Sequence, residues 1–113
     1  MQHAPDQKPD IDLVLRALSD ATRRSILEHL VKSEEATVTE LTAEAGVTQG
    51  AVSQHLKTLK QAGLVLERPD GRKVHYRAQT AGLEPLYDWM AEYGVFWRDR
   101  FASLRKLLKE IDP

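Results

Sequence analysis

Residues 39–61 contain two short helical patterns that are separated by only three residues, Gly46-Val47-Thr48. In the first pattern, Thr39 is expected to cap the helix and Leu41 to be its main apolar anchor. Gly46 is suited to end that helix, and Thr48 is suited to cap the next one. A short helix, a three-residue turn and a second helix are the parts of a helix-turn-helix, so this stretch predicts a small, mainly helical fold.

The second of these helices, residues 49–61, has a polar face without any acidic residue. On a helical wheel Val52, Leu56 and Leu59 form the buried side, and the opposite arc carries glutamine, serine, threonine and lysine. Glutamine can pair bidentately with adenine, serine and threonine can bond to base edges or phosphates, and lysine neutralises phosphates. This face therefore predicts contact with the major groove of DNA; the alternative is an ordinary surface helix that happens to lack acids. The predicted contact residues on the helix are Gln49, Ser53, Gln54, His55, Lys57, Thr58 and Lys60.

Two further helices are expected before this unit. The first begins near residue 11 and places four apolar side chains at helical spacing, namely Ile11, Val14, Leu15 and Leu18. Asp20 is expected to cap the second helix, ATRRSILEHLVK, whose inward residues are Ile26, Leu27 and Leu30. Residues 1–9 include Pro5 and Pro9 and few apolar groups, so they predict a flexible N-terminal arm.

A β-hairpin is predicted directly after the polar helix, in LVLERPDGRKVHYRA. Pro69 suits the first corner of a type I turn, and Gly71 supplies the positive φ of a bulged hairpin. In the second strand Val74, Tyr76 and Ala78 alternate with basic residues, so one face can pack on the helices while the other faces outward. Such a hairpin is a wing that can reach the DNA backbone or the minor groove; the alternative is an edge hairpin whose charges prevent aggregation. The predicted wing contacts are Arg68, Arg72, Lys73, His75 and Arg77.

The charge of the chain is unevenly distributed. Residues 54–79 hold six basic and two acidic residues, a net +4, and the remainder holds 10 basic and 15 acidic residues, a net −5. An acidic body with one basic segment indicates a local contact with a polyanion. The 113 residues are enough for one domain, and they include no cysteine, no apolar run long enough to span a membrane and no signal sequence. We therefore expect a soluble, cytoplasmic protein.

The C-terminal third keeps helical spacing for about 29 residues, roughly 43 Å, although Gly94 is positioned to bend or break the helix. Six of the seven aromatic residues lie within fifteen positions there, which gives a wide apolar face that needs a partner. We expect this helix to pair with its copy and with the N-terminal helix in a symmetric dimer. The alternative is that part of the aromatic cluster forms a pocket for a small organic effector of unknown identity. The predicted dimerisation residues are Leu86, Trp89, Met90, Tyr93, Trp97, Phe101, Leu104 and Leu108.

Three consecutive segments of the chain resemble the ArsR family of winged helix-turn-helix repressors. These segments are LSDATRRSILEHL, TVTELTAEAGVTQGAVSQHLKTLKQAGLV and ERPDGRKVHYRA. The resemblance runs from about residue 13 to residue 78. It implies a dimeric repressor that binds an inverted repeat, with Gln49, Ser53, Gln54 and Lys57 in the groove. Ala21 stands where relatives often have proline, and Gly50 where they have a bulkier residue; neither change removes a contact group.

The resemblance also implies a histidine at the position of His55, which lies at the edge of the buried arc. A contact with DNA and a hydrogen bond within the domain both remain open for this side chain. Many relatives are metal sensors, but this chain has no thiolate around ELTAE and no histidine beyond residue 75. Asp88 and Glu92 are one helical turn apart, a spacing that is typical of a solvated face. We therefore predict no metal site and no cofactor.

The expected fold is mainly α with a small β-hairpin: a winged helix-turn-helix of about five helices plus a two-stranded wing, dimerising through its terminal helices. Its parts are a flexible arm (1–9), a DNA-binding domain (10–80) and a C-terminal amphipathic dimerisation helix of the same domain (81–113). The sequence has no nucleophile with a base, no paired carboxylates in a cleft and no phosphate-cradling glycine loop, so we do not expect an enzyme. The remaining rival is a winged helix that docks proteins, which should show apolar residues on the exposed arc.

Overall fold

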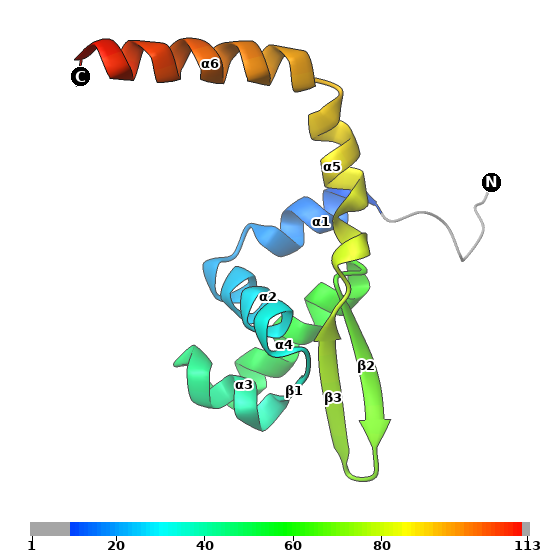
Figure 1. The fold of residues 1–113 in the computed structure, drawn as a ribbon. Coiled ribbons are helices and arrows are strands. Elements are labelled where there is room, and N and C mark those ends of the chain that lie inside the picture. The colour runs from blue at the N-terminus through cyan, green and yellow to red at the C-terminus, as the bar shows by residue number, and fades with distance from the viewer. Residues whose placement is uncertain (1–9, 112–113) are drawn as a thin grey trace, which may run out of the picture.

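The computed structural model describes residues 10–111, and the predicted flexible arm lies outside these residues. The helices are α1 (Ile11–Leu18), α2 (Ala21–Ser33), α3 (Val38–Ala45), α4 (Gln49–Gln61), α5 (Glu84–Ala91) and α6 (Gly94–Ile111), with a 3₁₀ turn at Thr80–Leu83. The strands β1 (Ala36–Thr37), β2 (Val65–Asp70) and β3 (Lys73–Ala78) form an antiparallel sheet in the order β1-β3-β2. Helices α1–α4 gather on one side of the long β2–β3 hairpin (Figure 1). This arrangement confirms the predicted mainly α winged helix-turn-helix.

The core lies among the first four helices and the base of the hairpin. The buried side of α4 is the one predicted, since Val52, Leu56 and Leu59 are all inaccessible to solvent or nearly so. Helix α2 contributes Ile26, Leu27 and Leu30, also as predicted. In α1, however, Val14 and Ala17 point inward while Leu15 is 47% exposed. The inward side of α1 is therefore narrower than the apolar spacing suggested, and leucines remain on its outer side.

Three of the four predicted caps are confirmed. Asp20 accepts the N–H of Arg23 at 2.9 Å, Thr48 accepts the N–H of Ala51 at 3.1 Å, and Gly46 has a φ of 71° at the end of α3. The prediction for Thr39 was wrong, because α3 begins two residues earlier and Thr37 caps it in a capping box with Glu40. The T-x-x-E spacing of that box is the signal that favours Thr37.

The hairpin differs from its predicted form in two respects. Asp70 pairs with Lys73, so the loop is only Gly71 and Arg72, and the strand continues through Pro69. Gly71 has a φ of 64°, which confirms the predicted left-handed position. The second difference is that the wing has a third strand, β1, which pairs with β3. This strand is only two residues long, too short to produce an alternating pattern in the sequence.

A tight turn connects α2 to β1. Glu34 has a φ of 74° and a ψ of −54°, and the N–H of Glu35 bonds to the carbonyl oxygen of Ser33 at 2.9 Å. This is a γ-turn with a positive central φ, which is strained for a residue with a Cβ. The turn places Glu35 beside the sheet.

The C-terminal region is two helices and not one. Helix α5 ends at Ala91, and α6 begins at the predicted break point, Gly94, and leads away from the body (Figure 1). Before α5, Gly82 passes so close to the end of α4 that an added Cβ would lie 2.1 Å from the carbonyl oxygen of Gly63. No helix among residues 10–111 is both long and apolar enough to cross a membrane.

Candidate nucleic-acid interface

The exposed face of α4 is polar and free of acids in the structure. Its exposed residues are Gln49, Gly50, Ser53, Gln54, Lys57, Lys60 and Gln61. Of the seven side chains on this helix that are predicted to contact DNA, five are exposed, and His55 and Thr58 are half-buried. Thr58 is half-buried, and its hydroxyl donates to the carbonyl oxygen of Gln54 at 3.2 Å, which leaves only its oxygen lone pairs for a ligand.

Lys60 is held at the C-terminal end of this face by an acidic side chain of the wing. Its ammonium group bonds to Glu67 on β2, and the hydroxyl of Tyr76 donates to the other oxygen of Glu67 at 3.2 Å. The hydrogen bond from Lys60 lowers the pKa of Glu67, and burial is the main cause that raises the pKa of Tyr76. Lys60 therefore joins α4 to the wing and has less charge to offer to DNA than the prediction assumed.

His55 makes a hydrogen bond within the domain. Its Nδ1 lies 3.2 Å from Nη1 of Arg23, at the start of α2. The ring is half-buried, so the alternative of an internal partner is realised for one of its two nitrogens.

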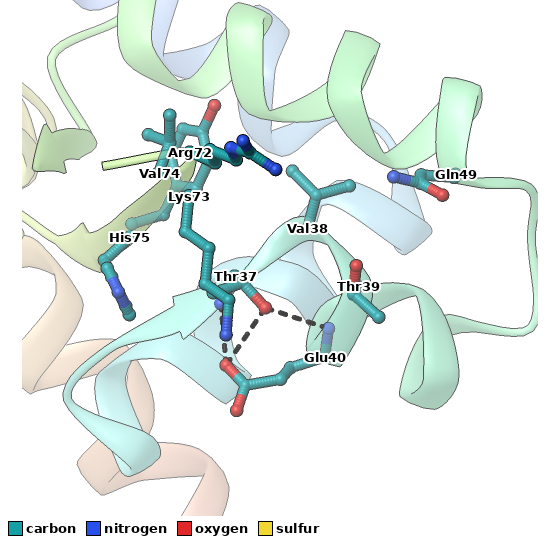
Figure 2. Close-up of a pocket in the computed structure, with 10 residues that line it drawn as sticks. Thr37, Val38, Thr39, Glu40, Gln49, Arg72, Lys73, Val74 and His75 are labelled. Carbon is teal, nitrogen blue, oxygen red and sulfur yellow. Dashed lines mark hydrogen bonds between the residues drawn. The ribbon is translucent and has the colours of Figure 1, made fainter. Parts of the chain in front are cut away.

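A groove of about 540 Å³ separates the tip of the wing from the N-terminal ends of α3 and α4. Figure 2 shows Gln49 on one side of this groove and Arg72 and Lys73 on the other. Glu40 lies at its edge, where the capping bond from the N–H of Thr37 lowers the pKa of the carboxyl group. The structure thus brings three predicted wing contacts, Arg72, Lys73 and His75, and one predicted contact of α4 to the same opening.

The remaining predicted wing contacts, Arg68 and Arg77, do not line the groove. Arg68 forms a bidentate pair with Glu35, with both nitrogen–oxygen distances at 2.9 Å. This hydrogen bond lowers the pKa of Glu35 and raises that of Arg68. His75 lies between Asp70 (3.4 Å) and Glu35 (3.9 Å), and Arg77 is exposed close by. Arg68 and His75 are therefore engaged with acids of the wing, unlike Arg72 and Lys73, which have no ion pair within residues 10–111.

The predicted dimerisation residues form an exposed apolar surface along α5 and α6. Trp89, Met90, Tyr93, Trp97, Phe101, Leu104 and Leu108 are all at least 38% exposed. Leu86 differs from the others, because it is half-buried and packs on the core of its own domain. Trp97 stacks on Phe101 at 5.8 Å, and a hollow of about 430 Å³ opens where α5 meets α6, lined by Tyr87, Met90, Ala91, Gly94, Trp97, Arg98 and Phe101.

Within residues 10–111, no three histidine or carboxylate side chains are grouped so that they could hold a metal ion. Asp88 and Glu92, the spaced pair found in the sequence, lie on or at the end of α5, where the N–H of Glu92 bonds to the carbonyl oxygen of Asp88.

Sequence reasoning missed the role of two adjacent arginines at the start of α2. Arg23 bonds to the carbonyl oxygens of Ala17 and Arg16, and Arg24 bonds to that of Leu18 at 2.6 Å, so both satisfy the open end of α1. A signal for this role was present in the sequence. Basic side chains in the first turn of a helix interact unfavourably with the helix dipole. Their presence at the start of α2 indicates that another contact compensates for this unfavourable interaction.

Comparison with known proteins identifies relatives over most of the chain. The family described as "Bacterial regulatory protein, arsR family" matches residues 20–66. The chain is 45% identical over 97 residues to the HTH-type transcriptional regulator Rv2034 of Mycobacterium tuberculosis, which covers 86% of this chain and 87% of that protein. It is 31% identical over 80 residues to the transcriptional repressor SdpR of Bacillus subtilis, covering 71% and 88% of the two chains. An ArsR-like transcriptional regulator from Rhodococcus sp. RHA1 has a similar structure, with a TM-score of 0.67, 31% identity and coverage of 86% and 91%.

Proposed function

Because the chain belongs to the ArsR family of bacterial regulatory proteins, we propose that it is a homodimeric repressor that binds an inverted-repeat operator without a metal cofactor. As a member of this family it is a DNA-binding transcriptional regulator, and the expectation that it is not an enzyme is confirmed. The dimer, the inverted repeat and the independence from metal are the parts that we propose.

The observation that carries the proposal is the acid-free exposed face of α4 beside the groove of the wing. Gln49, Gln54 and Lys57 are exposed on this face, which supports the proposal that the two glutamines read base edges and the lysine neutralises a phosphate. Arg72 and Lys73 extend the positive surface across the groove. The rival function, a winged helix that docks proteins, requires apolar side chains on this face, and its exposed residues include none.

The apolar surface of α5 and α6 supports a symmetric dimer. Helix α1 packs against α5, and Leu13 and Leu15 leave apolar surface on α1 as well. Two copies that cover these surfaces would be related by a two-fold axis, which suits a palindromic operator with half-sites about one helical turn apart.

Independence from metal is supported by the chemistry of the side chains. The chain has no cysteine, and its four histidines all precede residue 76. Carboxylates alone at the spacing of Asp88 and Glu92 are poor ligands for the transition metals that regulators sense.

A second candidate function, sensing of a small organic effector, is favoured by the hollow between α5 and α6. Its walls are mostly aromatic and aliphatic, and it is close to the size of a small-ligand pocket. Occupation of the hollow would alter the emission of Trp97 and the affinity for the operator together. Emission changes without a change in operator affinity would reject an effector role.

The proposed function is tested by fluorescence anisotropy with DNA from upstream of the gene and with a scrambled duplex, at several salt concentrations, with and without a chelator. We expect tight, sequence-selective and salt-sensitive binding that the chelator does not change, and a dimer in analytical ultracentrifugation. Loss of DNA binding in the presence of the chelator would reject the proposal that binding is independent of metal. Absence of binding to both duplexes at low salt would favour the protein-docking function.

A further inference from the structure

The side chain of Arg23 lies where three helices meet. Its Nε donates to the carbonyl oxygen of Ala17 at 2.8 Å, and its Nη2 donates to that of Arg16 at 3.2 Å, both at the end of α1. Its Nη1 reaches Nδ1 of His55 on α4 at 3.2 Å. The backbone N–H of the same residue bonds to Asp20, the cap of α2. One arginine residue therefore connects the end of α1 and the start of α2 to the middle of α4, the recognition helix of the proposed function.

The contact with His55 determines where that ring carries its proton. A guanidinium group has five N–H donors and no acceptor, so Nδ1 of His55 must accept. The proton of the neutral ring is then on Nε2. In the described part of the chain, every buried side-chain nitrogen or oxygen has a hydrogen-bond partner. Nε2 of His55 has no hydrogen-bond partner among these residues. It is therefore not buried and reaches solvent. The residue itself lies at the flank of the acid-free face of α4.

We propose that Arg23 is a positioning residue for DNA binding, which fixes α4 against the end of α1 and orients His55 so that its Nε2–H donates to a DNA phosphate. This inference rests on the proposed function. Phosphate contacts of this kind set the register of a recognition helix without reading sequence. The two interpretations of His55 left open by the sequence are thereby joined, because one ring nitrogen is bound within the domain and the other is offered to DNA.

The same contact links the surface of α1 to the surface that binds DNA. Helix α1 packs against α5 and exposes Leu13 and Leu15, so its position depends on what covers that side of the molecule. Arg23 holds the last carbonyl groups of α1 and a side chain of α4 at once. Movement of α1 would therefore change the orientation of His55.

Arg24 provides a matched control, because it is the next residue, carries the same charge and caps the same helix. Its Nη1 bonds to the carbonyl oxygen of Leu18 at 2.6 Å, and its side chain makes no hydrogen bond to α4 among residues 10–111. If Arg23 served only to cap α1, removal of either arginine should have a similar effect on DNA binding.

The test compares Arg23→Met, His55→Ala, the double variant, Arg24→Met and His55→Gln by anisotropy on the operator duplex. We expect Arg23→Met and His55→Ala each to weaken binding by roughly tenfold, as for the loss of a hydrogen bond to a charged group, and the double variant to be no weaker than the worse single one. Arg24→Met should stay within about twofold of the unaltered protein. His55→Gln should stay within about threefold, because the amide keeps both an acceptor for Arg23 and a donor for phosphate. Thermal melts establish that each variant is folded, and His55→Gln tests the proposal even if Arg23→Met does not fold.

A second readout is the nitrogen NMR spectrum of ¹⁵N-labelled histidine, which distinguishes the two neutral tautomers. We expect His55 to carry its proton on Nε2 in the unaltered protein and to become a mixture of tautomers in Arg23→Met. Additive losses in the double variant, an equal loss in Arg24→Met, or a proton on Nδ1 of His55 would each overturn the inference while leaving the proposed function intact. Failure of the unaltered protein to bind any duplex would overturn both.

Discussion

The tip of the wing offers a quantitative test of how the protein holds DNA. Arg72 and Lys73 line the groove beside α4 and have no acidic partner within residues 10–111, so both charges are available to phosphates. We predict that the double variant Arg72→Ala/Lys73→Ala weakens binding to operator and random DNA alike. Each phosphate contact contributes about 0.9 to the slope of log affinity against log salt concentration, so the loss of two contacts from each protomer of the proposed dimer should flatten the slope by about 3.6. Over a fourfold increase in salt, that difference corresponds to roughly a 150-fold difference in affinity.

The measurement is an anisotropy titration at four or more salt concentrations on both duplexes. The charge-matched control is Arg105→Ala/Lys106→Ala, which removes two exposed basic residues from α6, away from the wing. Its slope should equal that of the unaltered protein. An equal flattening in both double variants would mean that net charge and not the position of the wing controls the salt dependence. A change of sequence preference in the wing variant would show that the wing reads bases.

Four further changes follow from individual features. Gln54→Ala should weaken operator binding by about 1–3 kcal/mol and leave random DNA nearly unaffected in competition titrations, because we propose that its exposed amide pairs with a base. Gly82→Ala should lower the free energy of unfolding in urea by roughly 1–3 kcal/mol or more, since the new Cβ would lie 2.1 Å from the carbonyl oxygen of Gly63. Glu34→Gly should raise it by about 1 kcal/mol, because glycine relieves the positive φ of the γ-turn. The hydrogen bond from Arg68 lowers the pKa of Glu35 from its ordinary value of 4.5. The stabilisation of the folded state by this bond should therefore be complete above pH 4.5 and be lost as the pH falls through the lowered pKa. Acid denaturation of Arg68→Ala should lack this component.

Each of these predictions has an outcome that contradicts it. Equal losses on both duplexes would make Gln54 a backbone contact. An unchanged urea midpoint for the Gly82 variant would mean that the approach to α4 can relax, and destabilisation by Glu34→Gly would mean that the turn is not strained. Identical acid transitions with and without Arg68 would show that the pair contributes nothing to the stability of the wing.

The features that the sequence predicted correctly depend on residues that are close together in the chain. The caps at Asp20 and Thr48 and the buried stripe of α4 each follow from a few neighbouring positions. The location of the wing and the position of Gly71 follow in the same way.

The features that the sequence did not predict depend on distant partners. Arg68 and Glu35 are 33 positions apart, and Arg23 and His55 are 32 positions apart. The sequence does not show which acidic side chain lies beside a basic one, so a paired arginine is predicted to be free to bind DNA. This is why Arg68 was grouped with Arg72. The break between α5 and α6 was anticipated at Gly94, but the spacing of residues in the sequence does not encode the direction in which α6 leaves the body.

The ion pairs of the wing also bear on how fast the protein finds its operator. With Arg68 and Lys60 neutralised by Glu35 and Glu67, the lysine and arginine side chains that line the groove without an ion pair are Arg72 and Lys73, and Lys57 is exposed on α4. A polyanion is then attracted toward the face that carries the recognition helix, and residues 10–45, which hold eight acidic and four basic residues, repel it. The protein would first meet the duplex with α4 turned toward the bases and would keep this orientation while it slides along the DNA. The uneven distribution of charge would therefore affect the association rate more than the lifetime of the bound complex.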